Sequence, residues 1–476
     1  MRHVRIWALL IVTLAGCADD EEKQDKECTQ ADPASCADGL ACEQVGDGDK
    51  YECLPPVIVS GRVFDSLAET GIAAATIVGL DANGAARTQV SRSDAQGNYE
   101  LPVSVRRDED GSPVEEAITL RVAAADYQPF PSVPRTALPI ELELATQTGT
   151  GDAGADAGAA GGYRIENAAT QVALIPLSEA ERGGSTVEGR IAAEAAGGAL
   201  VLALQGDSAA SSAISDQDGA FVLFNVPEGS LTLEAYRVGL SVTAETVSVP
   251  SMGLTGVVLE ADDAALATVS GNLQIVNAPG GLTTSVILVV ASTFDPAVVR
   301  GEAPAGLRAE NVSGDFTIAD VPPGRYAVLA AFENDQLVRD PDEGIGGTEV
   351  VFVDVDGADV TLDQSFKVTE ALAITSPGAE NVEQVARGTL SLVWADDSSE
   401  EGYELRVYDA LGKLVHENKA VPAVTGSPTV QYALNASAYE PGMLYQFRVW
   451  SYRLRQSQRT FISASEDLRG VFEIAR

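Results

Sequence analysis

Three stretches of the sequence share one pattern, and this pattern decides the fold. The clearest copy opens with Glu188-Gly189-Arg190-Ile191, continues with a turn from Asp216 to Gly219 and the aromatic Phe221, and ends with Asn225-Val226-Pro227-Glu228-Gly229. Glycine supplies the positive φ of a tight hairpin turn, and Asp bonds its own backbone there. We expect the aromatic residue that follows to point into a hydrophobic core. The pattern therefore predicts β-hairpins packed over a core.

Two further copies lie before and after this one. The first copy comprises Ser60-Gly61-Arg62-Val63, the turn Asp94 to Gly97, and Tyr99. The third comprises Ser270-Gly271-Asn272-Leu273, the turn Asn311 to Gly314, Phe316, and Asp320-Val321-Pro322-Pro323-Gly324. The first copy lacks the V-P-x-G element, and the charged insertion Arg106 to Gly111 interrupts its pattern. In all three copies Gly is expected at the turn, so Gly219 and Gly314 are predicted to be structural.

The rest of the chain also has the pattern of β-strands. Leu231 and Leu233 alternate with Thr232 and Glu234, which is the period of a half-buried strand. Long stretches with a helical period are absent, and turn residues are closely spaced between short strands. The sequence thus predicts an all-β protein built of tandem Greek-key β-sandwich domains. A length of 476 residues suits three or four such domains.

The repeats resemble the carboxypeptidase regulatory-like family, small prealbumin-like sandwiches that overlap in fold with starch-binding modules. The resemblance covers residues 57 to 365 and implies a non-catalytic module. The zinc peptidase domain that such modules sometimes accompany needs an H-x-x-E pair and a third His, which this sequence lacks. We expect sandwiches at residues 57–145, 163–262 and 266–366. The Gly/Ala/Asp-rich residues 146–162 are expected to be a flexible linker that lets the sandwiches reorient.

Residues 370–476 differ from the repeats. Trp394 ends an alternating strand, and a Pro-Gly turn at Pro441-Gly442 precedes Tyr445 and a second alternating strand. This resembles the fibronectin type III signature, in which a Tyr of the tyrosine-corner kind follows such a turn. The resemblance implies that Trp394 lies in the core of a fourth sandwich.

The N-terminus has the features of an exported protein. Arg2 and Arg5 precede an apolar run that is too short to cross a membrane, and the run ends in Leu14-Ala15-Gly16-Cys17. These four residues resemble the lipobox of bacterial lipoproteins. The resemblance implies a signal peptide at residues 1–16 and a lipidated Cys17, followed by an acidic tether at 17–27. Ala18, in place of the Asp that retains lipoproteins in the inner membrane, favours the outer membrane.

Four further cysteines lie close together within residues 28–54. Cys28, Cys36, Cys42 and Cys53 occur in a segment that is too short to fold on a hydrophobic core alone. In an exported chain they indicate two disulfides, with three pairings possible. A zinc site is disfavoured because no C-x2-C pair is present and no His lies nearby.

Composition excludes several function classes. The formal net charge of −39 repels phosphate backbones, so nucleic-acid binding is excluded. The only histidines are His3 and His416, and no nucleophile elbow or phosphate-binding loop occurs. We therefore expect no enzyme, no cofactor and no metal. The Asp-rich turns Asp340 to Gly344 and Asp354 to Gly357 could hold calcium but do not fit an EF-hand, and solvated turns are favoured.

One basic stretch stands out on this acidic chain. Arg453, Arg455 and Arg459 lie in YRLRQSQR, which the fibronectin-like register assigns to the loop between the last two strands. Arg binds carboxylates and phosphates through a planar fork of donors. The sequence therefore indicates a docking loop for an acidic protein face or lipid phosphates, with an ordinary solvated loop as the alternative.

Together these features predict a non-enzymatic, lipid-anchored outer-membrane stalk of β-sandwiches with no transmembrane span. Its partner is expected to be a glycan or another envelope protein. Glycan binding follows from the starch-binding-like resemblance, although the mature chain keeps only Trp394 and Trp450 for stacking on sugars. The alternatives are a periplasmic scaffold and, less favoured, an unrecognised hydrolase.

Overall fold

The computed structural model describes residues 28–29, 36–37, 39–114, 116–132, 136–148, 162–276, 283–296, 300–330, 337–339, 350–397 and 399–476. The expected signal peptide, Cys17, the tether and the turn Asp340 to Gly344 lie outside these residues. Strands dominate the described chain, which contains three short 3-10 helices and no α-helix. No helix in this part of the chain is long and apolar enough to span a membrane. The protein is all-β, as predicted.

A small hairpin precedes the first sandwich. The hairpin consists of β1 (Ala41–Gln44) and β2 (Tyr51–Leu54). One sheet of the first sandwich contains β3 (Val57–Asp65), β6 (Asn98–Val103), β9 (Thr146–Gln147), β10 (Tyr163–Ile165) and β11 (Gln171–Leu174). The other contains β4 (Thr76–Leu80), β5 (Ser91–Arg92), β7 (Ala117–Ala123) and β8 (Ile140–Glu141), and the short helices η2 (Leu142–Leu144) and η3 (Ala168–Thr170) connect strands.

The second and third sandwiches each consist of two packed sheets whose strands are mostly antiparallel. The second has β12 (Ser185–Ala192), β15 (Ala220–Val226) and β18 (Leu254–Glu260) against β13 (Leu200–Gln205), β14 (Ser208–Ile214), β16 (Gly229–Tyr236) and β17 (Glu245–Val249). One sheet of the third has β19 (Ala267–Val276), β22 (Asp315–Val321), β24 (Leu337–Arg339), β26 (Val360–Thr361) and β27 (Phe366–Glu370). The other has β20 (Thr284–Val290), β21 (Arg308–Val312), β23 (Gly324–Ala330) and β25 (Val351–Val355), with η4 (Ala291–Thr293) after β20.

The fourth sandwich packs a small sheet on a larger one. The small sheet contains β28 (Ile374–Ser376), β30 (Thr389–Ala395) and β33 (Thr429–Asn435). The larger contains β29 (Glu383–Val385), β31 (Gly402–Asp409), β32 (Leu414–Pro422), β34 (Leu444–Arg455), β35 (Gln458–Ala464) and β36 (Val471–Ile474). Trp394 is fully buried against Tyr403, and the backbone N–H of Glu440 donates to the Tyr445 hydroxyl at 2.9 Å.

The repeated glycine and aromatic residues face each other across the first strand pair of each repeat. Gly61 lies opposite Tyr99, Gly189 opposite Phe221, and Gly271 opposite Phe316. All three rings are buried, as predicted. A Cβ added at Gly189 would lie 2.5 Å from the Phe221 ring. The glycine thus leaves the space that the cross-strand aromatic fills, which explains why the two residue types repeat together.

The boundary of the first sandwich differs from the expectation. In every repeat a late strand returns parallel to the opening strand: β11 to β3, β18 to β12, and β27 to β19. Residues 163–174 therefore complete the first sandwich and do not begin the second. β9, which consists of the first two residues of the predicted linker, pairs with β10, which follows the linker. The Gly/Ala/Asp-rich segment is thus an insertion within one sandwich. Because its composition is that of a linker, the strands β10 and β11 that follow it were assigned to the next sandwich.

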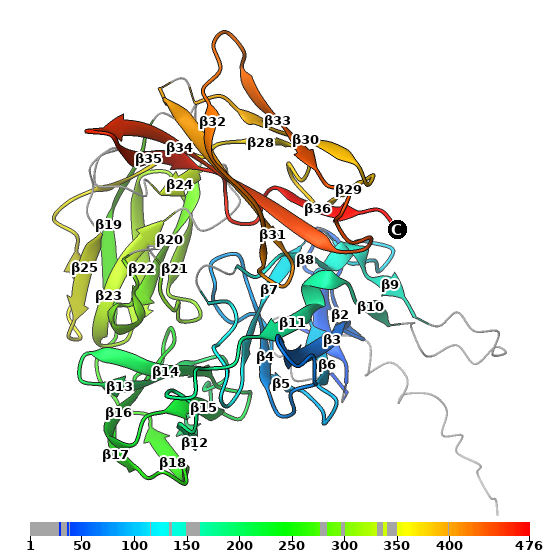
Figure 1. Cartoon of the computed structure of the whole chain (residues 1–476). Coiled ribbons are helices and arrows are strands. Elements are labelled where there is room, and N and C mark those ends of the chain that lie inside the picture. The colour runs from blue at the N-terminus through cyan, green and yellow to red at the C-terminus, as the bar shows by residue number, and fades with distance from the viewer. Residues whose placement is uncertain are drawn as a thin grey trace, which may run out of the picture.

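The sandwiches cluster together and do not form a row. In Figure 1 the first (blue to cyan), second (green), third (yellow-green) and fourth (orange to red) surround a common centre. The two faces of β13 explain this arrangement. One face, with Val201 and Ala203, packs in the core of the second sandwich. The other face packs in the hydrophobic cluster that contains the core of the third sandwich and carries Leu200, Leu202 and Leu204. Outer sheet faces that are apolar must be covered. The expected stalk of reorienting sandwiches is therefore wrong for these four units.

Polar contacts connect the clustered sandwiches. Arg121 on β7 donates to Ser212 of the second sandwich at 2.7 Å and to Glu302 of the third at 3.2 Å. The fourth sandwich contacts the first, where the N–H of Val382 donates to the Glu141 carboxylate at 2.5 Å. Leu444 of the fourth sandwich also belongs to the first sandwich's core cluster. The fourth sandwich, the last along the chain, therefore packs against the first.

Candidate functional site

The predicted docking loop is a tight hairpin between β34 and β35. Gln456 and Ser457 form its two-residue turn, with φ values of 51° and 66°. Arg455 pairs with Gln458, Leu454 with Arg459, and Arg453 with Thr460. Because neighbouring side chains alternate between the faces of a strand, Arg453 and Arg455 share one face and Arg459 lies on the other. The three arginines lie on strands and do not form one basic surface.

Two of these arginines have partners within the chain. Arg453 donates to the carbonyl oxygen of Ser399 at 2.6 Å. Arg459 stacks over the ring of Tyr452 and lies 3.5 Å from a carboxylate oxygen of Glu404. Arg455 is exposed and has no partner among the described residues. It is therefore the arginine of this set that is free to bind another molecule.

An acidic loop, residues 396–401, holds the hairpin in place. Leu454 donates its N–H to the Glu401 carboxylate, and the N–H of Glu401 donates to the carbonyl of Tyr452 at 2.9 Å. Asp397 accepts from the Ser451 hydroxyl at 2.7 Å. Burial raises the pKa of Glu400, and the nearby charges of Asp396 and Asp397 add to this effect. The loop thus binds the hairpin through hydrogen bonds to its backbone, to Ser451 and to Arg453. The carboxylate that an arginine of the set contacts is that of Glu404 on β31.

The second tryptophan of the mature chain is covered by arginines. The guanidinium groups of Arg406 and Arg448 lie 5.2 and 5.4 Å from the centre of the Trp450 ring. Arg448 also pairs with Asp467 at 2.8 Å, and Arg300 of the third sandwich pairs with the same carboxylate. Burial, followed by the charge of Arg300, lowers the pKa of Arg448 to about 9. Trp450 is thus partly buried beside two arginines, one of which shares Asp467 with Arg300 of the third sandwich.

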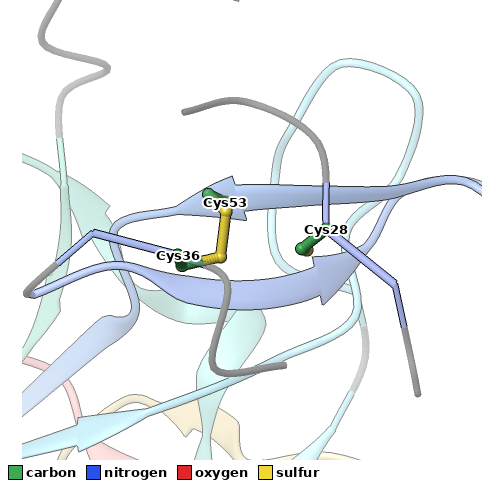
Figure 2. Close-up of side chains that lie close together, drawn as sticks. All are labelled: Cys28, Cys36 and Cys53. Atoms are coloured by element: carbon green, nitrogen blue, oxygen red, sulfur yellow. A yellow bond between two sulfur atoms is a disulfide. The ribbon is translucent and has the colours of Figure 1, made fainter. Parts of the chain in front are cut away.

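The four cysteines of the N-terminal hairpin form two disulfides. Cys28 pairs with Cys42, and Cys36 pairs with Cys53. The sulfur atoms of Cys28, Cys36 and Cys53 lie within 4.8 Å of one another, and Figure 2 shows the Cys36–Cys53 bond beside Cys28. A zinc site would need thiolates. Because all of these sulfurs are in disulfide bonds, the segment is cross-linked, as the sequence predicted, by one of the three possible pairings.

The charged insertion of the first repeat receives this hairpin. Arg107 donates to the Glu43 carboxylate at 2.6 Å, and both side chains are almost fully buried. The N–H of Val105 donates to the other carboxylate oxygen of Glu43 at 3.0 Å, and Arg107 also donates to the carbonyl of Pro55 at 2.8 Å. Burial raises the pKa of Glu43, an effect that Arg107 opposes. The insertion that interrupts the repeat pattern is therefore a docking element.

The remaining sequence candidates have local roles. The His416 ring nitrogen lies 2.8 Å from the Tyr432 hydroxyl, and this contact connects β32 to β33 in the opposite sheet. Burial lowers the pKa of His416. Asp354 lies 3.6 Å from Arg325, and Asp356 accepts from the N–H of Ala358. These carboxylates do not converge with others into a cluster of metal-ligand spacing within the described residues.

A pocket of about 270 Å³ lies where the first and fourth sandwiches meet. Glu141, Glu166 and Glu473 line it, together with Arg476. Neither it nor the residues at the sandwich contacts, such as Arg121 and Glu43, were found by sequence reasoning. The sequence feature that could have pointed to the Glu43 contact is the charged insertion after Tyr99, because it occupies the place where the other repeats have their V-P-x-G element.

Comparisons with known proteins give only weak likenesses. No protein-family model and no curated protein matches the chain. A DUF3823 family protein from Bacteroides ovatus is 11% identical, with a TM-score of 0.21, over 44% of this chain and 98% of that chain. The minor pilin of Streptococcus agalactiae is 12% identical, with a TM-score of 0.17, over 41% of this chain and 99% of its own. BcpA, the major pilin subunit of Bacillus cereus, is 11% identical, with a TM-score of 0.15, over 66% and 99%. Similarity this low says nothing about what the chain binds.

Proposed function

We propose that the chain is a non-enzymatic outer-membrane lipoprotein whose clustered β-sandwiches bind a partner at the cell envelope. One observation carries this proposal: a disulfide-bonded segment that begins at Cys28 follows the Leu14-Ala15-Gly16-Cys17 motif after a short acidic stretch. Disulfides persist in oxidising compartments, which supports export. Acyl chains on Cys17 would then supply the anchor. The parallel closing strand of each repeat and the Tyr445 hydrogen bond support the carboxypeptidase regulatory-like and fibronectin type III-like assignments.

Changing Cys17 to Ser tests the anchor. We expect an uncleaved or soluble precursor, because the lipid is the anchor that the sequence offers. Membrane fractionation measures this outcome, and a Cys17→Ser protein that remains in the outer membrane contradicts the lipoprotein assignment. Protease shaving of intact cells then separates two forms of the proposal. Release of peptides from residues 57–476 supports display at the cell surface, whereas full protection supports a periplasmic scaffold.

We place the docking surface at the tip of the β34–β35 hairpin. Arg455 is exposed there without a partner among the described residues, next to Leu454, whose exposed fraction is 51%. An exposed guanidinium favours a carboxylate or phosphate on the partner. Binding should weaken with salt, because exposed charges are screened beyond about 8–10 Å at physiological ionic strength.

Pull-downs from envelope extract test this surface with the full-length protein. We expect Arg455→Ala to lose partners that the wild type retains at low salt. Arg92→Ala, which removes an exposed arginine of the first sandwich, is the matched control and should retain them. Equal retention by both variants would show that the hairpin is not the docking site.

Glycan binding is a narrower form of the proposal and depends on Phe352. This β25 residue is the large aromatic of the described repeats with a substantially exposed side chain, at 42%. It packs edge-on against Phe294, and the Arg325 guanidinium lies 5.6 Å from its ring centre. A glycan array with wild type and Phe352→Ala decides whether the repeats bind sugars through this ring. Absence of binding by the wild type would remove the glycan from the proposal.

A further inference from the structure

The second and third repeats contact the preceding sandwich through the same position. Asn225 and Asp320 each lie four residues after the core aromatic, and both have positive φ, at 56° and 54°. Asn225 contacts the turn that follows β7 of the first sandwich, and Asp320 contacts the turn that follows β16 of the second. In each of these turns the contacting N–H belongs to a residue with positive φ, three positions after the strand ends.

The contact at Asn225 uses its whole side-chain amide. Its oxygen accepts from the N–H of Asp126 at 2.7 Å. Its nitrogen donates to the carbonyl oxygens of Ala124 at 3.2 Å and Tyr127 at 2.9 Å. Three hydrogen bonds from one amide fix both the position and the orientation of the neighbouring turn.

The contact at Asp320 uses the backbone instead. The N–H of Gly239 donates to the Asp320 carbonyl at 2.9 Å, and the N–H of Val238 donates to the carbonyl of Ala305 at 3.0 Å. Gly324, the glycine of the V-P-x-G element, makes room for the preceding sandwich, because a Cβ there would lie 2.8 Å from the Tyr236 ring. Tyr236 in turn packs edge-on against Tyr326.

The first repeat uses the same corner for a different neighbour. Val103 lies four residues after Tyr99, and Val105 and Arg107 follow it at the place of the missing V-P-x-G element. These two residues hold Glu43 of the disulfide hairpin, which is the unit that precedes the first repeat. In all three repeats, the chain just beyond the core aromatic therefore receives the preceding unit.

We propose that this corner is the recognition site by which each repeat binds the unit before it, and that its sequence specifies which unit fits. Asn225 accepts a turn that presents one N–H between two carbonyls, and Asp320 with Gly324 accepts a turn that carries an aromatic ring. The Arg107 insertion accepts a buried carboxylate. The interaction surface lies within the chain and does not depend on the proposed envelope function.

Two isosteric substitutions in the full-length chain test this proposal. Asn225→Asp keeps the acceptor but removes both donors and places a charge against the carbonyls of Ala124 and Tyr127. Asp320→Asn changes charge at the equivalent position but keeps the backbone carbonyl that Gly239 uses. Hydrogen–deuterium exchange followed by mass spectrometry reads the turns at residues 122–130 and 235–242. Residues 199–205, in β13, report on the second sandwich itself.

We expect Asn225→Asp to speed exchange at residues 122–130 by about tenfold while β13 is unchanged. Asp320→Asn should leave both turns as in the wild type. Unchanged exchange at 122–130 in Asn225→Asp would overturn the proposal. Faster exchange in β13 as well would also overturn it, because Asn225 would then serve its own sandwich and not recognition of its neighbour.

Discussion

The turn glycines Gly219 and Gly314 differ in how much space a Cβ atom would have and in their backbone conformation. Gly219 has a φ of +78°, and a Cβ there would lie 2.6 Å from the carbonyl oxygen of Ile191. Gly314 was expected to match it, but its φ lies outside the left-handed region and its nearest neighbour would be Asn272 at 3.9 Å. The two turns share a sequence pattern but differ in which residue takes positive φ, and in the third copy that residue is Asn311.

Replacing each glycine by alanine separates the two turns. We expect Gly219→Ala to lower the free energy of unfolding by about 1–3 kcal/mol, because both the backbone conformation and the close carbonyl oppose a Cβ. Gly314→Ala should be close to neutral. Urea denaturation of the full chain measures both changes. Equal losses would show that the difference in φ does not govern the cost.

The buried pair Glu43–Arg107 makes a prediction with a defined pH dependence. Removing one partner of a buried ion pair costs about 3–5 kcal/mol, so Arg107→Ala should strongly destabilise the docked hairpin. The pKa of Glu43 is already raised by burial, and losing Arg107 raises it further. A raised carboxyl pKa gives stability that is present at low pH and lost as the pH rises through the folded-state value. The variant should therefore lose more stability at pH 7 than at pH 4.

Urea titrations at these two pH values measure the effect, with Arg106→Ala as the matched control. Arg106 is its neighbour in sequence but is half exposed and lies 4.0 Å from the exposed Asp47. We expect this control to change little at either pH. A loss for Arg107→Ala that is the same at both pH values would contradict the role assigned to Glu43.

At the scale of the strand, the alternating pattern of the sequence predicted strands and buried residues, but it did not predict which distant strands pair. Alternation and turn residues predicted the β-strand character of the chain and the burial of Tyr99, Phe221 and Phe316, and the fibronectin-like resemblance predicted the burial of Trp394. They did not show that β11 returns to β3 after a low-complexity insertion, because strand pairing over that distance leaves no local signal. The hairpin arginines stood out as a basic stretch on an acidic chain, but the fibronectin-like register assigned them to a loop, whereas they lie on β34 and β35. Their partners, the Ser399 carbonyl for Arg453 and Glu404 for Arg459, were not predicted.

The hairpin itself supports a prediction on stability. Arg459 stacks on Tyr452 and lies near the buried Glu404, whereas Arg455 on the same hairpin has no partner among the described residues. We expect Arg459→Ala to cost about 1 kcal/mol of unfolding free energy and Arg455→Ala to cost nothing measurable. Thermal melts of the two variants test this difference. Combined with the pull-downs, they separate a structural arginine from a binding one.

At the scale of the molecule, apolar outer faces and buried arginines hold the four sandwiches in one cluster. Arg121 is central, because its 9% exposed side chain bonds to the second and third sandwiches at once. A compact chain of this length has a radius of gyration of about 22 Å, and a row of four sandwiches would have roughly twice that value. We expect X-ray scattering from protein that begins at Cys28 to lie near the lower value.

Arg121→Ala tests what closes the cluster. It removes the donor that Ser212 and Glu302 share and leaves the hydrogen bond from the Ser212 hydroxyl to Glu302, at 2.9 Å, as the remaining contact of this junction. The three sandwiches should therefore separate more readily. We expect the radius of gyration to increase, and more so at high salt, because Arg308 and Asp81 also join the first and third sandwiches by a 2.8 Å ion pair that salt screens. Arg164→Ala, whose ion pair with Glu100 lies within the first sandwich, should leave the radius unchanged. If Arg121→Ala stays as compact as the wild type, apolar packing alone holds the cluster, and the polar junction is a consequence of closure and not its cause.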